Sequence, residues 1–421
     1  MFNYCNSLET LDTSRWTLNS VLKTNNMFEN CQKMKTVATD NWGDLSKVEN
    51  ASGMFEYCSS LETLDTSNWT LDECIRIDYM FSNCRNLKTL DVSKFTTKAV
   101  KVYFMFNECR SLETLNLDSL NVTNCNTFEN LFYNCYSLTS LNVNNLDVSN
   151  IYNFNSCFRN CKSLTKIDIS NWNITKVQYF SYFMSGSGIT TVIAPNSIES
   201  PYFINMDSCF ENCENLTNIS DLDNIKINNV TSARGIFYGC SALTEVDTSK
   251  WLNYTGDSTG FWFSNCTSLH KITTAGISGK KSGMAECMGR RWAYADDLSV
   301  DKTVLFGYQE KDEPILPGTY VLSYDYTYEM WDGETRHIYF AWGDIASDKI
   351  TDKTRAGYKF KGWYNDSACT ISYNHGEKVE SNKTIYAGWD QVSCTVTFDS
   401  QGGTSVISKP VKWGGNSYKT Y

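Results

Sequence analysis

The sequence has 421 residues, and its 37 Lys and Arg against 47 Asp and Glu give a formal net charge of -10. The charges are spread without long basic runs, so the chain lacks the basic footprint that nucleic acid requires, and we exclude nucleic acid as a partner. No stretch approaches about 18 consecutive apolar residues, and no charged segment followed by an apolar core opens the chain, so neither a membrane span nor a signal peptide is predicted within this sequence.

A repeat of roughly 26 residues organises the first two-thirds of the chain, and its skeleton is Phe-x-x-Cys-x-x-Leu-x-x-Leu, as in residues 54–69. Eleven units can be aligned on anchor positions at Cys5, Cys31, Cys58, Cys84, Cys109, Cys135, Cys161, Gly186, Cys213, Cys240 and Cys266. A phenylalanine stands three residues before every anchor, from Phe2 to Phe183 and on to Phe263. Residues 1–277 are therefore predicted to form one solenoid, in which each unit buries its apolar face against the next.

Each unit is expected to have two halves. In Thr63–Ser67, the alternation of apolar and polar residues predicts a short strand whose Leu64 points inward. In the second half, apolar residues at Ile77, Met80, Phe81 and Cys84 have the spacing of a helical turn. We therefore expect an α/β solenoid with parallel strands on one face and short helices on the other. Met1 already lies in the column four before the anchor, so we expect further chain upstream.

The outward strand positions lie five, seven and nine residues after each anchor. They form the candidate ligand-binding residues Thr63, Asp65, Ser67, Thr89, Asp91, Ser93, Thr114, Asn116 and Asp118. Stacked rows of hydroxyls, amides and carboxylates suit a polar or basic protein segment, a glycan, or a cation that bridges carboxylates. Two alternatives remain open: the same columns are a solvated strand edge, or the binding site lies on the predicted helical side, near Glu56 and Arg85.

Fourteen of the 17 cysteines occupy repeat columns that are otherwise apolar. Besides the ten anchors these are Cys74, Cys125, Cys157 and Cys209. A free buried cysteine behaves as a small hydrophobe, so we expect core thiols rather than disulfides or a metal site.

Residues 60–69 (SLETLDTSNW), 146–151 (LDVSNI) and 157–164 (CFRNCKSL) resemble the BspA-like class of leucine-rich repeats. This resemblance implies a bacterial surface or secreted protein that adheres to host proteins or to other cells. Unit eight departs from the pattern at Phe183–Ile189, where glycine replaces the anchor cysteine.

After the repeats, residues 278–317 are predicted to form a cap and linker that ends near Pro314 and Pro317. Residues 318–390 are rich in aromatic and β-prone segments, with RAGYKFKGWY at 355–364 and KTIYAGW at 383–389. These segments resemble the Listeria-Bacteroides repeat, which implies a small β-grasp-like domain. Residues 391–421 are interpreted as an incomplete second copy that starts at CTVTFDSQGG.

No catalytic motif is found: the three histidines, His270, His337 and His375, lie near no nucleophile pattern, and no metal or phosphate-binding spacing appears. We therefore expect no enzymatic activity, no cofactor and no metal in this chain. The first hypothesis is a cell-surface or extracellular binding protein for a protein or glycan on a host or neighbouring cell. The alternative is the display or targeting region of a larger secreted enzyme.

Overall fold

The structure is a computed structural model, and it describes residues 1–42, 44–118, 120–195, 198–222, 225–226, 230–249, 251, 262–274, 290–299, 317–329, 335–397, 401–402 and 407–412. The chain divides into two compact units. The first comprises Met1–Arg290 with Lys302–Tyr320, and the second comprises Arg291–Asp301 with Val321–Tyr421. Each is described by itself.

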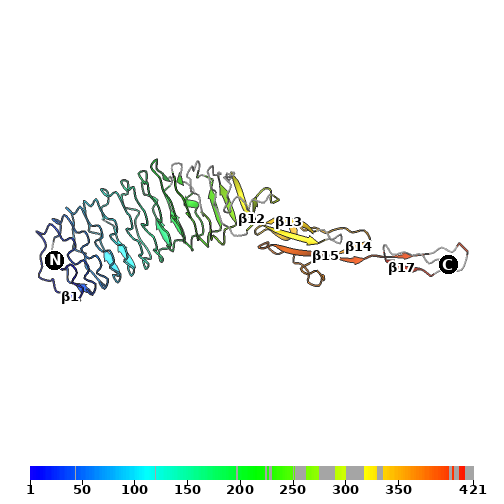
Figure 1. The fold of residues 1–421 in the computed structure, drawn as a ribbon, viewed down its shortest axis with the longest axis horizontal. Helices are drawn as coiled ribbons and strands as arrows, with labels where there is room; N and C mark the ends of the chain where they lie inside the picture. Colours follow the sequence, from blue (N-terminus) through cyan, green and yellow to red (C-terminus); the bar gives the residue numbers. More distant parts are fainter. Residues whose placement is uncertain are drawn as a thin grey trace. The chain divides into compact units, whose positions relative to one another are not determined.

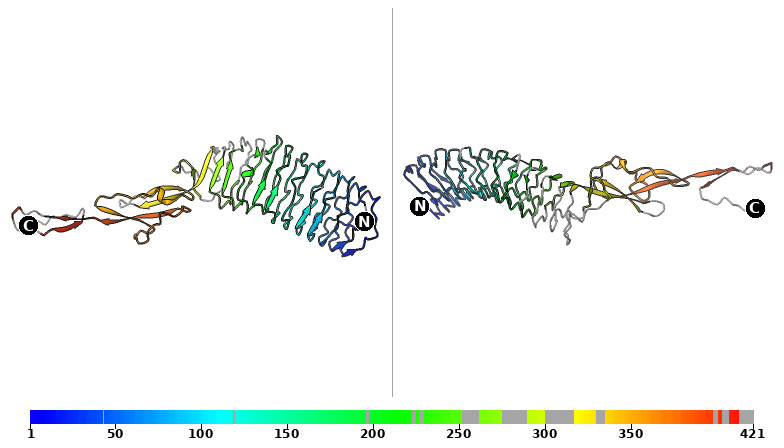
Figure 2. Two further views of the ribbon diagram at one scale, coloured as in Figure 1. Left: turned by 180° about the vertical axis from the view of Figure 1, so that it is seen from behind. Right: turned by 90° about the horizontal axis from the view of Figure 1, so that it is seen from above.

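The first unit is a solenoid of stacked coils (Figure 1). Its short strands pair in parallel between successive coils, as predicted: β1 (Thr10–Leu11) with β2 (Thr36–Val37), β3 (Thr89–Asp91) with β4 (Thr114–Asn116), β5 (Lys166–Asp168) with β6 (Thr191–Ile193), β7 (Ile198–Glu199) with β8 (Ile225–Lys226), and β9 (Glu245–Thr248) with β10 (Lys271–Thr274). The coils can be followed from behind and from above in Figure 2. With the exception of β7 and β8, which lie later in their coils, these parallel strands come from equivalent positions and form one face of the array.

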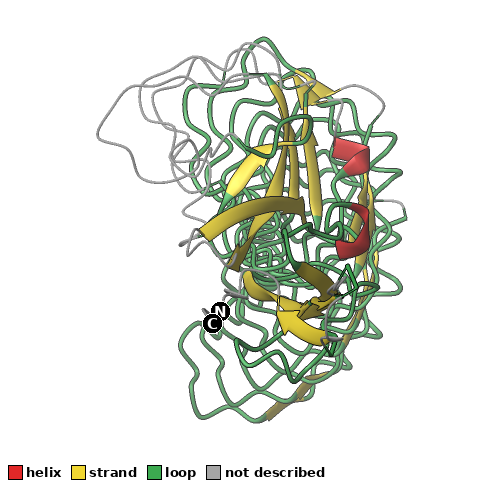
Figure 3. Ribbon diagram, turned by 90° about the vertical axis from the view of Figure 1, so that its right-hand side faces the viewer, coloured by secondary structure: helices red, strands yellow, loops and turns green. Residues whose placement is uncertain are grey.

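The prediction of short helices on the opposite face is wrong. Within the described part of the solenoid, the sole helical segment is the three-residue 3-10 turn η1 (Ser220–Leu222). Figure 3 shows the second half of the coils as loop rather than helix. Instead, parallel bridges connect this half from coil to coil, for example Asn50 with Arg76 and Arg76 with Lys101. The fold is thus a β-solenoid.

Backbone hydrogen bonds explain why Ile77–Cys84 is not helical. Alternate N–H groups donate to the next coil: that of Ile77 to the carbonyl of Lys101 (3.2 Å), and that of Phe81 to the carbonyl of Met105 (3.0 Å). The N–H groups between them close tight turns within the coil, as when Cys84 donates to the carbonyl of Phe81 (3.1 Å). A helix would instead pair every N–H four residues back along the same coil.

Two left-handed residues in each coil from the second to the tenth also exclude a helix. They lie five residues and one residue before the anchor, as Tyr79 (φ 58°) and Asn83 (φ 62°) in one coil and Asn130 (φ 54°) and Asn134 (φ 60°) in another. A left-handed residue disrupts a right-handed helix and costs about 1–2 kcal/mol for a residue other than glycine. Because these chain reversals recur four residues apart, the apolar residues between them reproduce the spacing of a helix face.

Aromatic rings fill the centre of the coils. The phenylalanine column stacks face to face from Phe2 through Phe106 to Phe158, with ring centroids 5.2 to 6.1 Å apart. A second stack runs beside it, in which the Trp42 and Trp69 centroids lie 5.3 Å apart. Each ring contacts its counterpart in the next coil, so burial of a side chain depends on the presence of both neighbouring coils.

The repeat cysteines form no disulfides, as predicted, and 13 of the 14 are buried, with Cys5 at the first coil partly exposed. Their thiols do more than fill space. The Sγ of Cys58 donates to the carbonyl of Phe28 (3.1 Å), that of Cys84 to Phe55 (3.2 Å), and the pattern continues to Cys266, which donates to Phe237 (3.1 Å). The weak S–H donor adds a second hydrogen bond to a carbonyl of the preceding coil that already accepts the N–H of that coil's own anchor, as the carbonyl of Phe28 accepts from Cys31 (3.1 Å).

Unit eight corrects one detail of the alignment. Ser187, not Gly186, occupies the anchor position, because its N–H donates to the carbonyl of Met184 (2.9 Å) as each anchor cysteine does to its phenylalanine. Met184 therefore fills the phenylalanine column. Gly186 (φ 69°) lies in the left-handed column that precedes the anchor. Phe183 is displaced, and it meets Phe158 edge-on at 81° instead of stacking.

The second unit contains a mixed sheet formed by β12 (Gly318–Glu329), β13 (Thr335–Ala341), β14 (Tyr358–Tyr364) and β15 (Lys383–Gln391). β12 pairs antiparallel with β13 and parallel with β15, and β14 pairs antiparallel with β15. The strand order is β13-β12-β15-β14, with a parallel central pair. The 3-10 turn η2 (Ala346–Asp348) and residues such as Phe340, Trp363 and Ile385 contribute to its core.

The two remaining segments are described only in part. Most of the predicted cap and linker, 278–317, lies outside the described residues, and within it β11 (Trp292–Tyr294) pairs with β12. Of the predicted second repeat, 391–421, the structure describes an antiparallel pair formed by β16 (Ser393–Val396) and β17 (Lys409–Lys412).

Replacing Phe106 by Ala tests the phenylalanine stack. Phe106 is fully buried between Phe81 and Phe132, so its loss should cost about 3–5 kcal/mol of unfolding free energy and loosen both adjacent coils. Thermal unfolding and amide hydrogen exchange measure the two effects. The control is Ile75→Ala, at a position 48% exposed; equal melting temperatures for the two variants would contradict a stabilising stack.

Thiol labelling tests the buried cysteines. Burial raises the pKa of Cys31 to about 11 and that of Cys109 to about 12, so little reactive thiolate is present at pH 8. In anaerobically purified protein, an alkylating reagent should modify the exposed Cys394 first and the repeat cysteines only after denaturant is added. Peptide mapping by mass spectrometry reads the order, and rapid native labelling of Cys109 would refute burial.

Candidate functional site

The nine predicted ligand-binding residues lie on the strand side of three successive coils. Thr63, Asp65, Thr89, Asp91, Thr114, Asn116 and Asp118 are exposed, whereas Ser67 and Ser93 are partly buried. β3 and β4 bring two coils into register, with Thr89 opposite Thr114 and Asp91 opposite Asn116. The predicted rows of like side chains therefore exist.

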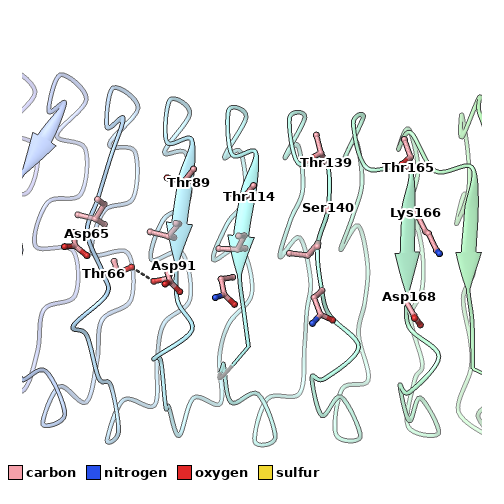
Figure 4. Close-up of a pocket in the computed structure, with 16 residues that line it drawn as sticks. Asp65, Thr66, Thr89, Asp91, Thr114, Thr139, Ser140, Thr165, Lys166 and Asp168 are labelled. Atoms are coloured by element: carbon pink, nitrogen blue, oxygen red, sulfur yellow. Dashed lines mark hydrogen bonds between the residues drawn. The ribbon is translucent and has the colours of Figure 1, made fainter.

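Five of the nine residues line a groove of about 920 Å³, which we call the strand-face groove: Asp65, Thr89, Asp91, Thr114 and Asn116. Thr63, Ser67, Ser93 and Asp118 are not among its lining residues. The groove continues over the next two coils through Thr139, Asn142, Thr165, Lys166 and Asp168 (Figure 4). Sequence reasoning missed this continuation, although the columns five and seven residues after Cys135 and Cys161 already contain Ser140, Asn142, Lys166 and Asp168.

The carboxylates of the groove are held by local turns. The N–H of Ser67 donates to Oδ1 of Asp65 (2.9 Å), and the N–H of Ser93 donates to Oδ1 of Asp91 (2.9 Å). Ser67 and Ser93 therefore lie in the turn that follows the strand, which corrects their predicted place as strand residues. Asparagine makes the same turn in the next coil, where Asn116 accepts from the N–H of Asp118 (3.1 Å). Such a turn fixes the orientation of the side chain.

These hydrogen bonds stabilise the charged form of the acids. The Ser67 hydrogen bonds lower the pKa of Asp65, and the backbone and side-chain hydrogen bonds from Ser170 lower the pKa of Asp168. Three carboxylates, Asp65, Asp91 and Asp168, and one ammonium, Lys166, line the groove, so its formal charge is -3 + 1 = -2. The surface thus favours a cationic ligand.

The opposite side of the coils contains a more buried acidic group. The carboxyl of Asp78 is buried and accepts from the guanidinium of Arg76 (2.9 Å) and from the hydroxyl of Ser52 (2.9 Å). Partial burial, together with the charges of Glu29 and Asp78, raises the pKa of Glu56 to about 7. Arg85 is exposed, and its guanidinium donates to the side-chain oxygen of Asn83 (3.2 Å). Neither Glu56 nor Arg85 lines the strand-face groove.

Comparison with known families confirms the two resemblances. Residues 202–279 match the BspA type leucine rich repeat region, and residues 324–388 match the Listeria-Bacteroides repeat domain. Residues 1–115 and 101–190 match a family described as a Mycoplasma protein of unknown function, DUF285. The chain carries BspA-type leucine-rich repeats and a Listeria-Bacteroides repeat. The lining residues of the strand-face groove, between Leu64 and Asp168, lie in the part of the solenoid that matches DUF285, and the BspA-type match covers later coils.

Two similar proteins come from Evansella cellulosilytica. One, named "Putative membrane protein", is 34% identical over 68 residues, which are 16% of this chain and 10% of that protein. The other, named "Putative Gly-rich membrane protein", is 36% identical over 61 residues, 14% of this chain and 7% of that protein. The matches thus span a tenth or less of these relatives. No helix of the described residues has the length and apolarity of a membrane span. Within the same residues, no three His, Cys, Asp or Glu side chains form a metal-binding group.

Glu56→Gln tests the raised pKa. The pKa of Glu56 is about 7 in the folded state, against an ordinary value of 4.5. Between these pH values the unfolded chain binds fewer protons than the folded one, so the free energy of unfolding falls as the pH rises. The variant should therefore melt higher than the parent at pH 8, and the two should melt together at pH 4.

The matched control is Glu62→Gln, at an exposed strand-side position, which should leave the melting temperature unchanged at both pH values. A stabilisation by Glu56→Gln that is equal at pH 4 and pH 8 would contradict a raised pKa.

Proposed function

We propose that this chain is a cell-surface or extracellular binding module, which uses the strand-face groove to hold a basic segment of a partner protein. The observation that supports the proposal is the groove itself. Polar side chains of five neighbouring coils line about 920 Å³ of surface, and hydrogen-bonded turns hold its acidic groups in fixed orientations.

The distribution of charge favours an extended basic peptide. Asp91 and Asp168 are three coils apart, which is about 14 Å at roughly 4.8 Å per coil, and an extended chain rises about 3.3 Å per residue. Two basic residues four positions apart would therefore reach both carboxylates, while the amides of Asn116 and Asn142 pair with the peptide backbone between them. Ordered acceptors of this kind reduce the entropic cost of binding.

The role proposed is binding rather than catalysis. His270, His337 and His375 are not among the residues that line the groove, and the groove pairs its acids with turn N–H groups rather than with a nucleophile. The family matches support a surface location, because BspA-type and Listeria-Bacteroides repeats are typical of surface proteins.

The test replaces Asp65 and Asp91 together by Asn. Asparagine already occupies this column at Asn116 and makes the same turn, so the double variant should fold normally. A fluorescent nonapeptide with lysines four residues apart should bind the parent, and the variant should weaken it at least ten-fold in fluorescence anisotropy.

The matched control is Asp44→Asn with Asp147→Asn, because both acids accept N–H bonds in similar turns (from Ser46 and Ser149) but neither lines the groove. It should leave the affinity unchanged. Binding that survives the Asp65 and Asp91 change, or that is lost instead on neutralising Glu56 and Arg85, would place the site elsewhere.

A further inference from the structure

A second hollow lies at the turn that precedes the strand in units seven to nine. Its volume is about 520 Å³, within the range of ligand pockets. Arg159 and Lys162 of unit seven line one wall, Glu211 and Glu214 of unit nine line the other, and residues 185–188 of unit eight lie between them. We call this hollow the unit-eight notch. It shares no lining residue with the strand-face groove.

The notch exists because unit eight lacks side chains that its neighbours have. Gly186 lies in the left-handed column that Asn160 and Asn212 occupy in the adjacent coils. Gly188 lies in the segment between the anchor and the strand, which is one residue shorter in unit eight than in unit seven. The backbone of unit seven packs so closely against it that a Cβ at this position would lie 2.1 Å from the carbonyl oxygen of Lys162.

The two cations of the notch contact tyrosine rings and lack counter-charges. The Arg159 guanidinium lies over the ring of Tyr182 (4.4 Å) and beside that of Tyr133 (5.9 Å), and its buried Nε has no hydrogen-bond partner. The Lys162 ammonium lies over Tyr136 (5.3 Å). Within the part of the chain that the structure describes, neither cation has an ion-pair partner. Cation–π contacts hold such groups in place without neutralising them.

The acidic wall is equally unpaired. Glu211 and Glu214 form no ion pair with any described residue, and Glu214 is exposed. The two walls therefore carry opposite charges, and the residues between them are neutral. The walls are two coils, or about 10 Å, apart. A ligand that carries both charges at this separation would pair with both walls.

The lining chemistry favours a peptide over a sugar. No aromatic residue lines the notch, so no ring is available to stack on a pyranose, whereas amides of Asn160, Asn212 and Asn215 are present to pair with peptide groups. In an extended peptide of the polyproline II type, which has three residues per turn and rises about 3.1 Å per residue, side chains three residues apart point to the same side and are about 9 Å apart, which is close to the separation of the walls.

We propose that the unit-eight notch is a second binding site, for an extended peptide segment with an acidic and a basic side chain three residues apart. The acidic side chain pairs with Arg159 and Lys162, and the basic one pairs with Glu211 and Glu214. This site does not depend on the strand-face groove.

The experiment uses the full chain and fluorescent capped hexapeptides that contain aspartate and lysine separated by two serines, two aspartates at the same spacing, or serine alone. The aspartate–lysine peptide should bind at least ten-fold more tightly than the other two. Arg159→Gln with Lys162→Gln should remove this preference, whereas Lys47→Gln with Lys88→Gln, at exposed positions outside both sites, should preserve it.

Two further variants keep the test decisive. Gly186→Asn places an asparagine in the notch, at the position that Asn160 and Asn212 occupy in the adjacent coils. Only the terminal Oδ1 of Asn160 must move to make room for the new side chain. This variant should fold and should lose peptide binding. Glu211→Lys with Glu214→Lys should reverse the preference toward the two-aspartate peptide. Equal affinity for all three peptides, or binding of a carboxylated oligosaccharide in place of the peptides, would overturn the proposal.

Discussion

Hydrogen bonds between successive coils are the constraint on which the structure depends. Because the N–H groups of Ile77, Tyr79, Phe81 and Asn83 donate to residues 24 positions later, equivalent residues of neighbouring units must lie side by side. In-register stacking then places phenylalanine on phenylalanine and thiol beside carbonyl. The same register brings Asp91 beside Asn116 at the surface. The buried core and the strand-face groove therefore both follow from the same hydrogen bonds between coils.

Periodicity predicted the solenoid because a column of identical residues can arise only where equivalent positions share an environment. The columns of Leu64 and Phe106 are buried, and those of Asp65 and Thr89 are exposed, as their alternation predicts. The backbone conformation in the second half of each repeat unit could not be predicted from this alternation. Ile77, Met80 and Phe81 have helical spacing, but their spacing comes from reversals at Tyr79 and Asn83, and apolar periodicity reports which residues are buried rather than how the chain turns.

The left-handed positions did leave a signal in the sequence. Asparagine and glycine recur one residue before the anchor, at Asn134, Asn160, Gly186, Asn212 and Gly239, and these are the residues that tolerate positive φ most readily. That signal also locates the true anchor of unit eight, since Gly186 continues this column and Ser187 follows it. The candidate groove was predicted in part, because its columns were followed for three coils and not through the next two, where Asn142 and Asp168 continue it.

A surface of repeated acids must manage repulsion between neighbouring coils. The columns show how this chain does so: a turn N–H binds one oxygen of Asp65 and of Asp91, and asparagine replaces aspartate in the next two coils, at Asn116 and Asn142. Each N–H bond disperses charge locally, and each amide separates charges by a further coil spacing of about 4.8 Å. The same hydrogen-bonded turn forms at Asn116 and Asn142, where the side chain is neutral. The charge at a given coil can therefore change without loss of the turn. Different charge patterns are therefore compatible with one repeat scaffold, and in the proposed function the pattern of Asp65, Asp91 and Asp168 is the part that contacts the basic segment of the partner.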